Sequence, residues 1–496
     1  MSRGLAVALK RGSQGGRSSG IVFAISVALS VATGAAVAQG RVEIGLVAAG
    51  GFFGLATLRH LPLTGWCLLL LVTTVAMRGV VTTLGLPQSL NFLHYPVAAG
   101  FVIAALQRPF RPVSKAPAIW LAGFLLVTVA SMLANLSHPL RALLFLIITG
   151  EPLLIVWALS RWDISDRDRR NIGVIVLLLA AVQFPIGALQ AAGAGLGDAV
   201  QGTLTGHGAG HHVLGGLFAL GLLIVTAAIA ARAVGIGRGL VGGALSLAMM
   251  LATGSIAITI LTALVVTLLP ALAVRTPRGA GGRRLSPRFL AAIVAGTAFG
   301  ISALFLAQVL VSNIFERAQR LATEEEFPEV QMLSERANDL GLFVFGSGPG
   351  TSASRTSILL IDAEEKGSPL AFFGLDPTPQ AREIASATRD PFGGSAEAFR
   401  SSALAIIGDL GVLGFAGLIV LFVSIWRQAS RSNDWLAPAA RAALVLTAML
   451  IFVDNWLEYP EFAVPLALLV GIVLSRRSEP DGRQEVPLPR EYPCAS

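Results

Sequence analysis

Polar and ionisable residues are rare in the apolar stretches of this chain, and those that occur there are the first candidates for chemistry. They are Arg78, Glu151, Gln183, Gln190, His211, His212 and Asp409. Such residues are costly in an apolar environment, so each needs a partner or a ligand. Arg78 and Glu151 could form an ion pair that only fixes helix packing, or Arg78 could snorkel to the interface. Alternatively, the Arg78 guanidinium could face a polyanionic headgroup in an outward-opening cavity.

Three of the six histidines lie in the run 202–212, which is rich in glycine and precedes an apolar stretch. Three histidines could suggest a metal site, but closed metal sites usually have four ligands. The run itself contains no acidic residue, and the nearest one before it is Asp198. We therefore expect no metal and no other cofactor. A helix start whose amides contact phosphate is favoured over a metal site. A solvated loop is an equally good alternative to that helix start.

Membrane-spanning helices must position these residues. Of the 496 residues, 54% are hydrophobic and 13% are charged, whereas an ordinary globular enzyme carries about 25% charge. We expect an all-α, polytopic bundle of twelve to fourteen spans, because some apolar runs are short for a crossing and two are separated only by Gly254-Ser255. The runs are 21–38, 44–58, 63–86, 93–107, 117–135, 140–160, 172–191, 211–233, 239–253, 256–274, 289–311, 402–426, 439–456 and 462–475.

The distribution of basic residues predicts the orientation. With the basic amino terminus inside, 26 of the 37 lysines and arginines fall at cytoplasmic junctions or in the two tails. This positive-inside pattern explains the net charge of +8 without a nucleic-acid partner. We expect a multi-pass protein of the bacterial inner membrane with cytoplasmic tails at 1–20 and 476–496. Ala36-Val37-Ala38 resembles a signal-peptide cleavage site, which is the alternative for the amino terminus.

One long segment, 313–401, separates about eleven spans in 21–312 from about three in 402–475. It is expected outside the cytoplasm, in the periplasm, and its composition favours short helices broken by turns. The sequence Gly346-Ser347-Gly348-Pro349-Gly350 predicts a turn, and 379–390 predicts an amphipathic helix. The chain has no Walker A, GxGxxG, HExxH or CxxC motif, so chemistry is expected within the membrane or at its outer face.

Several features occur in a fixed order between 170 and 475. A span ends near Gln190, Gly202-Thr203 forms a polar turn, and two helices meet at 253–255. Then come the outer loop, with Arg336 upstream of the glycine turn, and the sequence 408–414, Gly-Asp-Leu-Gly-Val-Leu-Gly. In this order the chain resembles the superfamily of O-antigen ligases and O-antigen polymerases, which are bacterial envelope glycosyltransferases.

The resemblance implies a GT-C-like fold and a metal-independent glycosyltransferase whose substrate is a polyprenyl diphosphate-linked glycan, with membrane lipid and other polysaccharide assembly proteins as further partners. Arginines would stabilise the leaving diphosphate, and a base would act near the acceptor hydroxyl. The expected catalytic residues are Arg336, Arg400, His211 and Asp409. The expected diphosphate-binding residues are Arg317, Arg320, Arg78 and Arg141.

The chain also departs from the family pattern. Where members commonly have a His-Asn pair before the acidic residue of the last motif, this chain has Arg400-Ser401. Ser255 lacks the usual neighbouring arginine, and Val200-Gln201 stands where a basic residue is frequent. These differences weaken the expectation of ligase-type catalysis specifically, and they leave open a polymerase-like activity, a divergent paralogue or the use of a different base. A flippase or secondary transporter is the third alternative, although the long outer segment has no counterpart in the first half of the chain.

Overall fold

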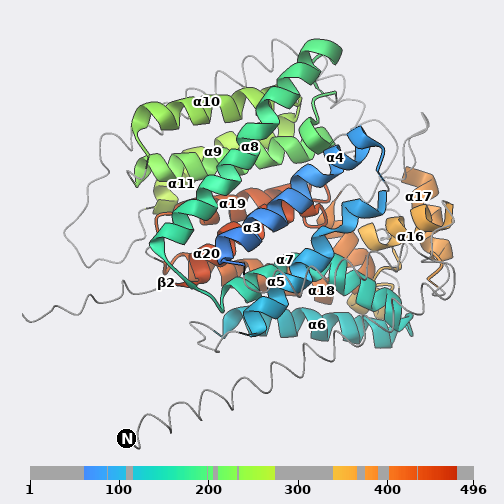
Figure 1. Cartoon of the computed structure of the whole chain (residues 1–496). Coiled ribbons are helices and arrows are strands. Elements are labelled where there is room, and N and C mark those ends of the chain that lie inside the picture. The colour runs from blue at the N-terminus through green and yellow to red at the C-terminus, as the bar shows by residue number, and fades with distance from the viewer. Residues whose placement is uncertain are drawn as a thin grey trace, which may run out of the picture.

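The computed structural model describes residues 61–86, 88–107, 115–197, 199–204, 210–231, 234–273, 339–352, 354–365, 375–388, 401–432 and 434–477. Within these ranges almost all regular structure is helical (Figure 1). The exceptions are two short strands, β1 (Asp163–Ile164) and β2 (Arg476–Arg477), which pair in parallel. The all-α architecture expected from the sequence is confirmed for this part of the chain.

The first half contains nine described α-helices, one π-helical turn and two short 3-10 turns. Leu63–Leu84 is continuous: α3 (Leu63–Leu71) passes through a π-helical turn, η1 (Val72–Ala76), into α4 (Met77–Leu84). After the 3-10 turn η2 (Gln88–Phe92) come α5 (His94–Leu106), α6 (Ala116–Ala134), α7 (Pro139–Leu159) and α8 (Asp166–Ala194). The 3-10 turn η3 (Gly202–Leu204) then precedes α9 (Gly210–Ala230), α10 (Ile236–Ala252) and α11 (Ile256–Ala273).

The described part of the second half begins with three short helices from the expected outer segment, α15 (Leu340–Phe345), α16 (Arg355–Glu365) and α17 (Pro379–Thr388). Three apolar helices follow: α18 (Ser402–Ala429), α19 (Ala437–Leu450) and α20 (Pro460–Leu474). Each starts at a residue suited to a helix start. Ser401 accepts a hydrogen bond from the amide of Leu404 at 3.3 Å, and α19 and α20 carry proline in their first turn.

Six of the described helices are long and apolar enough to cross a membrane, and five shorter apolar helices accompany them. The long ones are Leu63–Leu84, Ala116–Ala134, Pro139–Leu159, Asp166–Ala194, Gly210–Ala230 and Ser402–Ala429. The chain is therefore a membrane protein by the length and composition of its helices. The expected runs 21–38, 44–58 and 289–311 lie outside the described residues.

The core is formed by α9 and α20, which are buried on nearly every side. Surrounding helices turn large apolar side chains outwards: Leu126 of α6 is 70% exposed, Leu189 of α8 is 75% exposed and Val420 of α18 is 65% exposed. Because water would penalise such surface, these side chains are suited to contact with lipid tails.

The helix ends gather at two opposite ends of the bundle. In Figure 1, β2 lies at one end, and α16 and α17 lie at the other, beside the end of α4. Contacts agree with this arrangement, because the start of α8 meets the end of α20, whereas Thr356 of α16 and Arg141 at the start of α7 both lie close to Gly350. We call the end that carries α16 and α17 the loop end.

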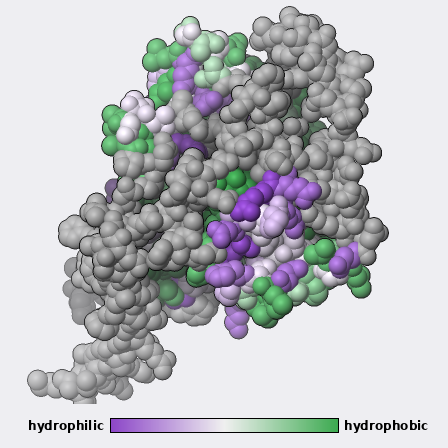
Figure 2. Space-filling view, turned by 90° about the vertical axis from the view of Figure 1, so that its right-hand side faces the viewer, coloured by the Kyte–Doolittle hydropathy of each residue, from purple (hydrophilic) through white to green (hydrophobic). Residues whose placement is uncertain are grey.

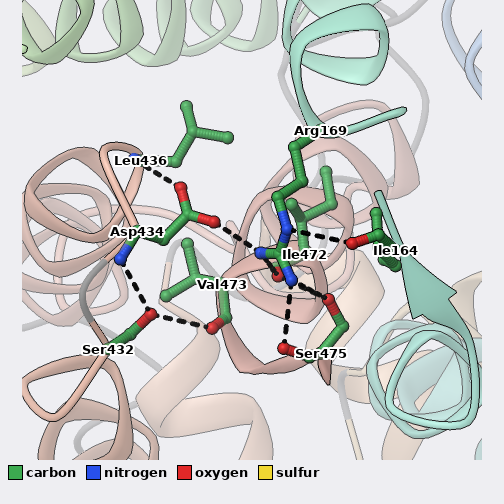
Figure 3. Close-up of polar contacts among 8 residues, drawn as sticks. All are labelled: Ile164, Arg169, Ser432, Asp434, Leu436, Ile472, Val473 and Ser475. Atoms are coloured by element: carbon green, nitrogen blue, oxygen red, sulfur yellow. Dashed lines mark hydrogen bonds and ion pairs between the residues drawn. The ribbon is translucent and has the colours of Figure 1, made fainter. Parts of the chain in front are cut away.

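At the opposite end, Arg169 of α8 joins three segments of the chain (Figure 3). Its side chain, 3% exposed, pairs with Asp434 and donates to the carbonyl of Ile472 at 2.6 Å. It also donates to the hydroxyl of Ser475 at 3.0 Å. A buried guanidinium needs such a set of acceptors, so this contact fastens α8 to the ends of α18, α19 and α20.

Candidate functional site

The expected glycine turn is present and docks on a break in α18. Gly346, Gly348 and Gly350 have φ values of 71°, 107° and 70°, and Gly411 interrupts α18 with a φ of 67°. The break frees carbonyls that the turn then uses: the amide of Ser347 donates to Gly408 O at 2.8 Å, and that of Gly348 donates to Asp409 O at 3.1 Å. The loop-end segment is thereby attached to a membrane helix by main-chain hydrogen bonds.

Asp409, expected to be catalytic, supports this turn. Its carboxylate is fully buried and accepts hydrogen bonds from the amides of Gly350 at 2.9 Å and Ser352 at 2.8 Å. The hydroxyl of Ser131 on α6 donates to the Asp409 carbonyl at 3.0 Å. Because each carboxylate oxygen accepts an amide of the turn, Asp409 fixes the turn to α18.

Arg141, expected to bind diphosphate, lies beside the same turn. It occupies the first turn of α7, is half-buried, and donates through Nη2 to the carbonyl of Asp376 at 2.6 Å. Its charge interacts with that of Asp409. A Cβ on Gly350 would approach its Cγ to 3.1 Å, so glycine at 350 lets the arginine stem lie against the turn.

Arg355 opens α16 immediately after the turn and was not among the residues predicted from the sequence. Its amide donates to Glu458 Oε2 at 2.6 Å, and its Nη1 donates to the Glu458 carbonyl at 2.6 Å. Burial lowers the pKa of Arg355, but the charges of Glu461 and Glu458 and the Tyr95 side chain outweigh that effect and raise it. Arg355 is therefore a permanently charged, half-buried cation.

Glu458 lies in the turn between α19 and α20 and is 4% exposed. Its carboxylate accepts two further hydrogen bonds in addition to that from Arg355. Asn455 donates to Oε2 at 2.6 Å, and Thr149 donates to Oε1 at 3.4 Å. Burial raises the pKa of Glu458, although the hydrogen bonds from Arg355 and Asn455 act in the opposite direction. A carboxyl group with these properties can exchange a proton more readily than an exposed glutamate.

Arg78 pairs with Glu461 (Nη1 to Oε1, 3.5 Å) and not with Glu151, so the packing pair suggested by the sequence is wrong. Glu151 instead contacts His94 Nδ1, at 3.0 Å through Oε1 and 3.2 Å through Oε2. The reason is that α5 packs along α7 and brings His94 to Glu151, whereas α20, which begins beside Glu461, contacts the π-helical turn η1 that precedes α4. Arg78 also interacts electrostatically with Arg355, which faces the same carboxylate.

These residues form an arginine–carboxylate cluster at the loop end, contributed by α4, α5, α7, α16, α20 and the turn that precedes α20. Its members are Arg78, His94, Tyr95, Glu151, Arg355, Glu458 and Glu461. Figure 2 faces this side of the molecule and shows hydrophilic residues gathered in one area beside hydrophobic ones. Exposed polar residues of the neighbouring segments include Asp376 and Arg382.

His211 lies near the start of α9, 9% exposed, with its ring 3.9 Å from that of His212. The hydroxyl of Ser255 donates to the His211 carbonyl at 3.1 Å. The charge of His212 interacts with Asp454, which lies in the same turn as Glu458. No metal-binding group of three His, Cys, Asp or Glu occurs among the described residues.

The two glutamines singled out in the sequence hold the Gly-Thr turn. Gln183 exchanges two hydrogen bonds with Thr203, at 2.7 and 2.8 Å, and Gln190 Oε1 accepts the amide of Gly202 at 2.7 Å. Thr203 also donates to the carbonyl of Val75 in the π-helical turn, at 2.9 Å. This region therefore connects α8 to the helix that carries Arg78.

The remaining predicted site residues, Arg317, Arg320, Arg336 and Arg400, lie outside the described residues. Among those described, Arg141 and Asp409 meet at the glycine turn, and Arg78 joins the cluster. No protein-family model, curated protein or solved structure matches this chain. The geometry of the loop end is consequently the basis for a functional proposal.

Arg355, Glu458 and Glu461 escaped the sequence analysis because they lie at the ends of helices rather than within apolar runs. A signal was present in both places. Glu458 and Glu461 are three residues apart around Pro460, at an expected outer junction, and Arg355 interrupts a run of serines and threonines directly after the glycine turn.

Proposed function

We propose that this protein is a membrane glycosyltransferase of surface polysaccharide assembly. It polymerises or transfers a glycan carried on a lipid diphosphate, at the outer face of the bacterial inner membrane. The observation that carries the proposal is the convergence of Arg78 and Arg355, from helices far apart in sequence, on Glu461 at the loop end, with Arg141 nearby at the glycine turn.

The reaction class requires groups of this kind. The bond between the sugar C1 and the diphosphate oxygen breaks, a bond from C1 to the acceptor oxygen forms, and the acceptor proton passes to a base. The diphosphate leaves with its extra negative charge, which arginines stabilise by paired hydrogen bonds. Arg78, Arg141 and Arg355 are assigned this role, and Asp409 is assigned the positioning of the turn that holds Arg141 and Arg355.

Glu458 is the favoured base among the described residues. It lies against Arg355, where a leaving group would be held, and its raised pKa suits proton transfer. His211, the base candidate from the sequence, lies at the start of α9 and is not a member of the arginine–carboxylate cluster. The resemblance to O-antigen ligases and polymerases supports the same reaction class, with a polyprenyl diphosphate-linked glycan as donor.

The test is deletion in the source organism followed by complementation with Arg355→Ala, Arg355→Lys and the control Arg427→Ala. Arg427 is an exposed arginine in the last turn of α18, away from the loop end. We expect Arg355→Ala to reduce glycan transfer about 100-fold at unchanged membrane abundance, and Arg355→Lys to retain part of it, because lysine keeps the charge but not the forked geometry. Full activity of Arg355→Ala would refute the assignment.

Analysis of lipid-linked intermediates in the deletion strain separates polymerase from ligase. Single capped repeat units indicate a lost polymerase, whereas accumulated lipid-linked polymer indicates a lost ligase that acts on a lipid or protein acceptor. An unchanged glycan profile would contradict both.

A lipid-linked oligosaccharide flippase is the second candidate, and the break in α18 favours it. Transporters often place discontinuous helices at their substrate sites, and α18 is interrupted at Gly411 while Leu63–Leu84 contains a π-helical turn. However, the carbonyls freed at Gly411 are used by the glycine turn rather than left for a substrate. Loss of all outward-facing lipid-linked units in the deletion strain would identify a flippase.

A further inference from the structure

The start of α16 holds a group of buried hydroxyls. Ser352 and Thr356 are fully buried and Ser357 is 1% exposed. In the described part of the chain the hydroxyls of these three residues have no hydrogen-bond partner. A buried hydroxyl without a partner costs folding free energy, so three of them within six residues suggest that they serve a ligand.

The same position has the electrostatics of an anion site. The amides in the first turn of an α-helix have no acceptor within the helix, and the helix dipole adds partial positive charge there. In α16, which has 11 residues, the amide of Arg355 donates to the Glu458 carboxylate at 2.6 Å. A carboxylate of the protein itself therefore already caps the helix start.

The glycine turn and Arg141 complete the surroundings. A Cβ on Gly350 would lie 2.7 Å from Cγ2 of Thr356 and 3.1 Å from Cγ of Arg141, so both side chains lie against the turn at Gly350. The side chains of Arg141 and Arg355 are half-buried. Two arginines, three hydroxyls and a helix start thus share one corner of the loop end.

We propose that Ser352 and the start of α16 bind one phosphate group of the lipid diphosphate, through the hydroxyls of Ser352, Thr356 and Ser357 and the first-turn amides of α16. Phosphate displaces the Glu458 carboxylate from the amide of Arg355, because two anions cannot share that amide. This inference rests on the proposed function for the identity of the ligand, and it assigns the site that holds one of its phosphates.

The purified full-length protein tests the proposal by titration with inorganic diphosphate and with farnesyl diphosphate. We expect the double variant Ser352→Ala, Thr356→Val to raise the Kd of both at least 5-fold, and Glu458→Gln to lower it, since a competing negative charge is removed. The matched control is Thr226→Val, whose hydroxyl donates to a carbonyl within α9. An unchanged Kd in the double variant would overturn the proposal.

Folding is monitored on the same samples. Since the hydroxyls make no hydrogen bond without ligand, the double variant should keep the wild-type unfolding temperature but lose the thermal shift that diphosphate gives the wild type. If the double variant unfolds at lower temperature, Ser357→Ala replaces it in the titration, and an unchanged Kd there overturns the proposal as well.

A phospholipid headgroup presents the same chemistry, so a competition experiment separates the two sources. Farnesyl diphosphate should displace bound inorganic diphosphate at lower concentration than phosphatidylglycerol in nanodiscs. Equal or better displacement by phosphatidylglycerol would overturn the assignment to the diphosphate donor. The binding assay does not depend on glycan transfer, so the two proposals can fail separately. If diphosphate binding depends on the hydroxyls but the deletion strain has an unchanged glycan profile, the proposed function is refuted and the phosphate site is not.

Discussion

At the scale of single residues, the loop end is governed by buried carboxylates that are held in different ways. The Asp409 carboxylate is satisfied by amides, whereas Glu458 is held by an amide and by Asn455. A sequence can reveal that Asp409 lies in an apolar run. It cannot reveal that the carboxylate accepts the amides of a turn some 60 residues earlier, because that contact depends on how α18 breaks.

Glu458 should make stability depend on pH. Its pKa in the folded protein is raised by burial above the unfolded value of about 4.3. Its contribution is therefore fully present below the unfolded pKa and is lost as the pH rises through the folded pKa. We expect the unfolding temperature in detergent to fall as the pH rises from the unfolded to the folded pKa of Glu458, and then to level off. Asp454, whose pKa burial also raises, acts in the same direction.

In Glu458→Gln this decline should be smaller, by about 1.4 kcal/mol for each unit by which the pKa is raised. Thermal unfolding followed at a series of pH values measures it. Glu383→Gln, an exposed change in α17, serves as the control and should follow the wild type. Parallel curves for wild type and Glu458→Gln would contradict the raised pKa.

At the scale of elements, the helices were largely predictable and their interruptions were not. The apolar runs 117–135 and 140–160 became α6 (Ala116–Ala134) and α7 (Pro139–Leu159), because hydrophobic length alone defines a helix in a membrane. The glycine turn at 346–350 was also expected from its composition. The break at Gly411 was not, since a glycine within an apolar run is common in membrane helices and carries no distinctive sign.

Docking of the glycine turn on α18 should depend on glycine at 411. A Cβ there would collide with the Val344 carbonyl, and the φ of 67° is unfavourable for alanine. We expect Gly411→Ala to cost about 1–3 kcal/mol and to detach the turn, with faster amide exchange in 340–352 and loss of glycan transfer. Hydrogen exchange followed by mass spectrometry measures this.

Gly417 provides the control in the same helix, because a Cβ at this position meets no atom within 4 Å. Gly417→Ala should leave exchange in 340–352 unchanged and stabilise α18 slightly. If Gly411→Ala also left the exchange unchanged, the break would not be what holds the turn.

At the scale of the whole molecule, the two ends of the bundle should face opposite sides of the membrane. Residues at expected outer junctions, such as Arg78, Arg141 and Glu461, lie at the loop end, and Arg169 and Asp434 lie at the other. The charge pattern of the sequence predicts which end faces the cytoplasm. The positive-inside rule describes how helices are inserted into the membrane, so it applies without knowledge of how they pack.

Cysteine labelling tests this orientation. Asp376 at the loop end and Asp163 at the other end are both exposed, so each can be replaced by cysteine. Cys67 is fully buried and can remain, and Cys494 is replaced by serine. In intact cells a membrane-impermeant maleimide should label Asp376→Cys and spare Asp163→Cys, and permeabilised membranes should give both signals. The reverse pattern in intact cells would place the loop end in the cytoplasm and remove the basis for an outer-face enzyme.

The contact made by Arg169 also has a consequence for biogenesis. Its partners Asp434 and Ser475 follow it by 265 and 306 residues. At a synthesis rate of about 5–20 residues per second, Arg169 spends on the order of ten seconds or more without them. Until then its guanidinium stays hydrated at the membrane surface. Helix α8 is therefore inserted early, but it is fixed in the bundle only when Arg169 contacts Asp434 and Ser475. Completion of this contact therefore awaits the synthesis of α20.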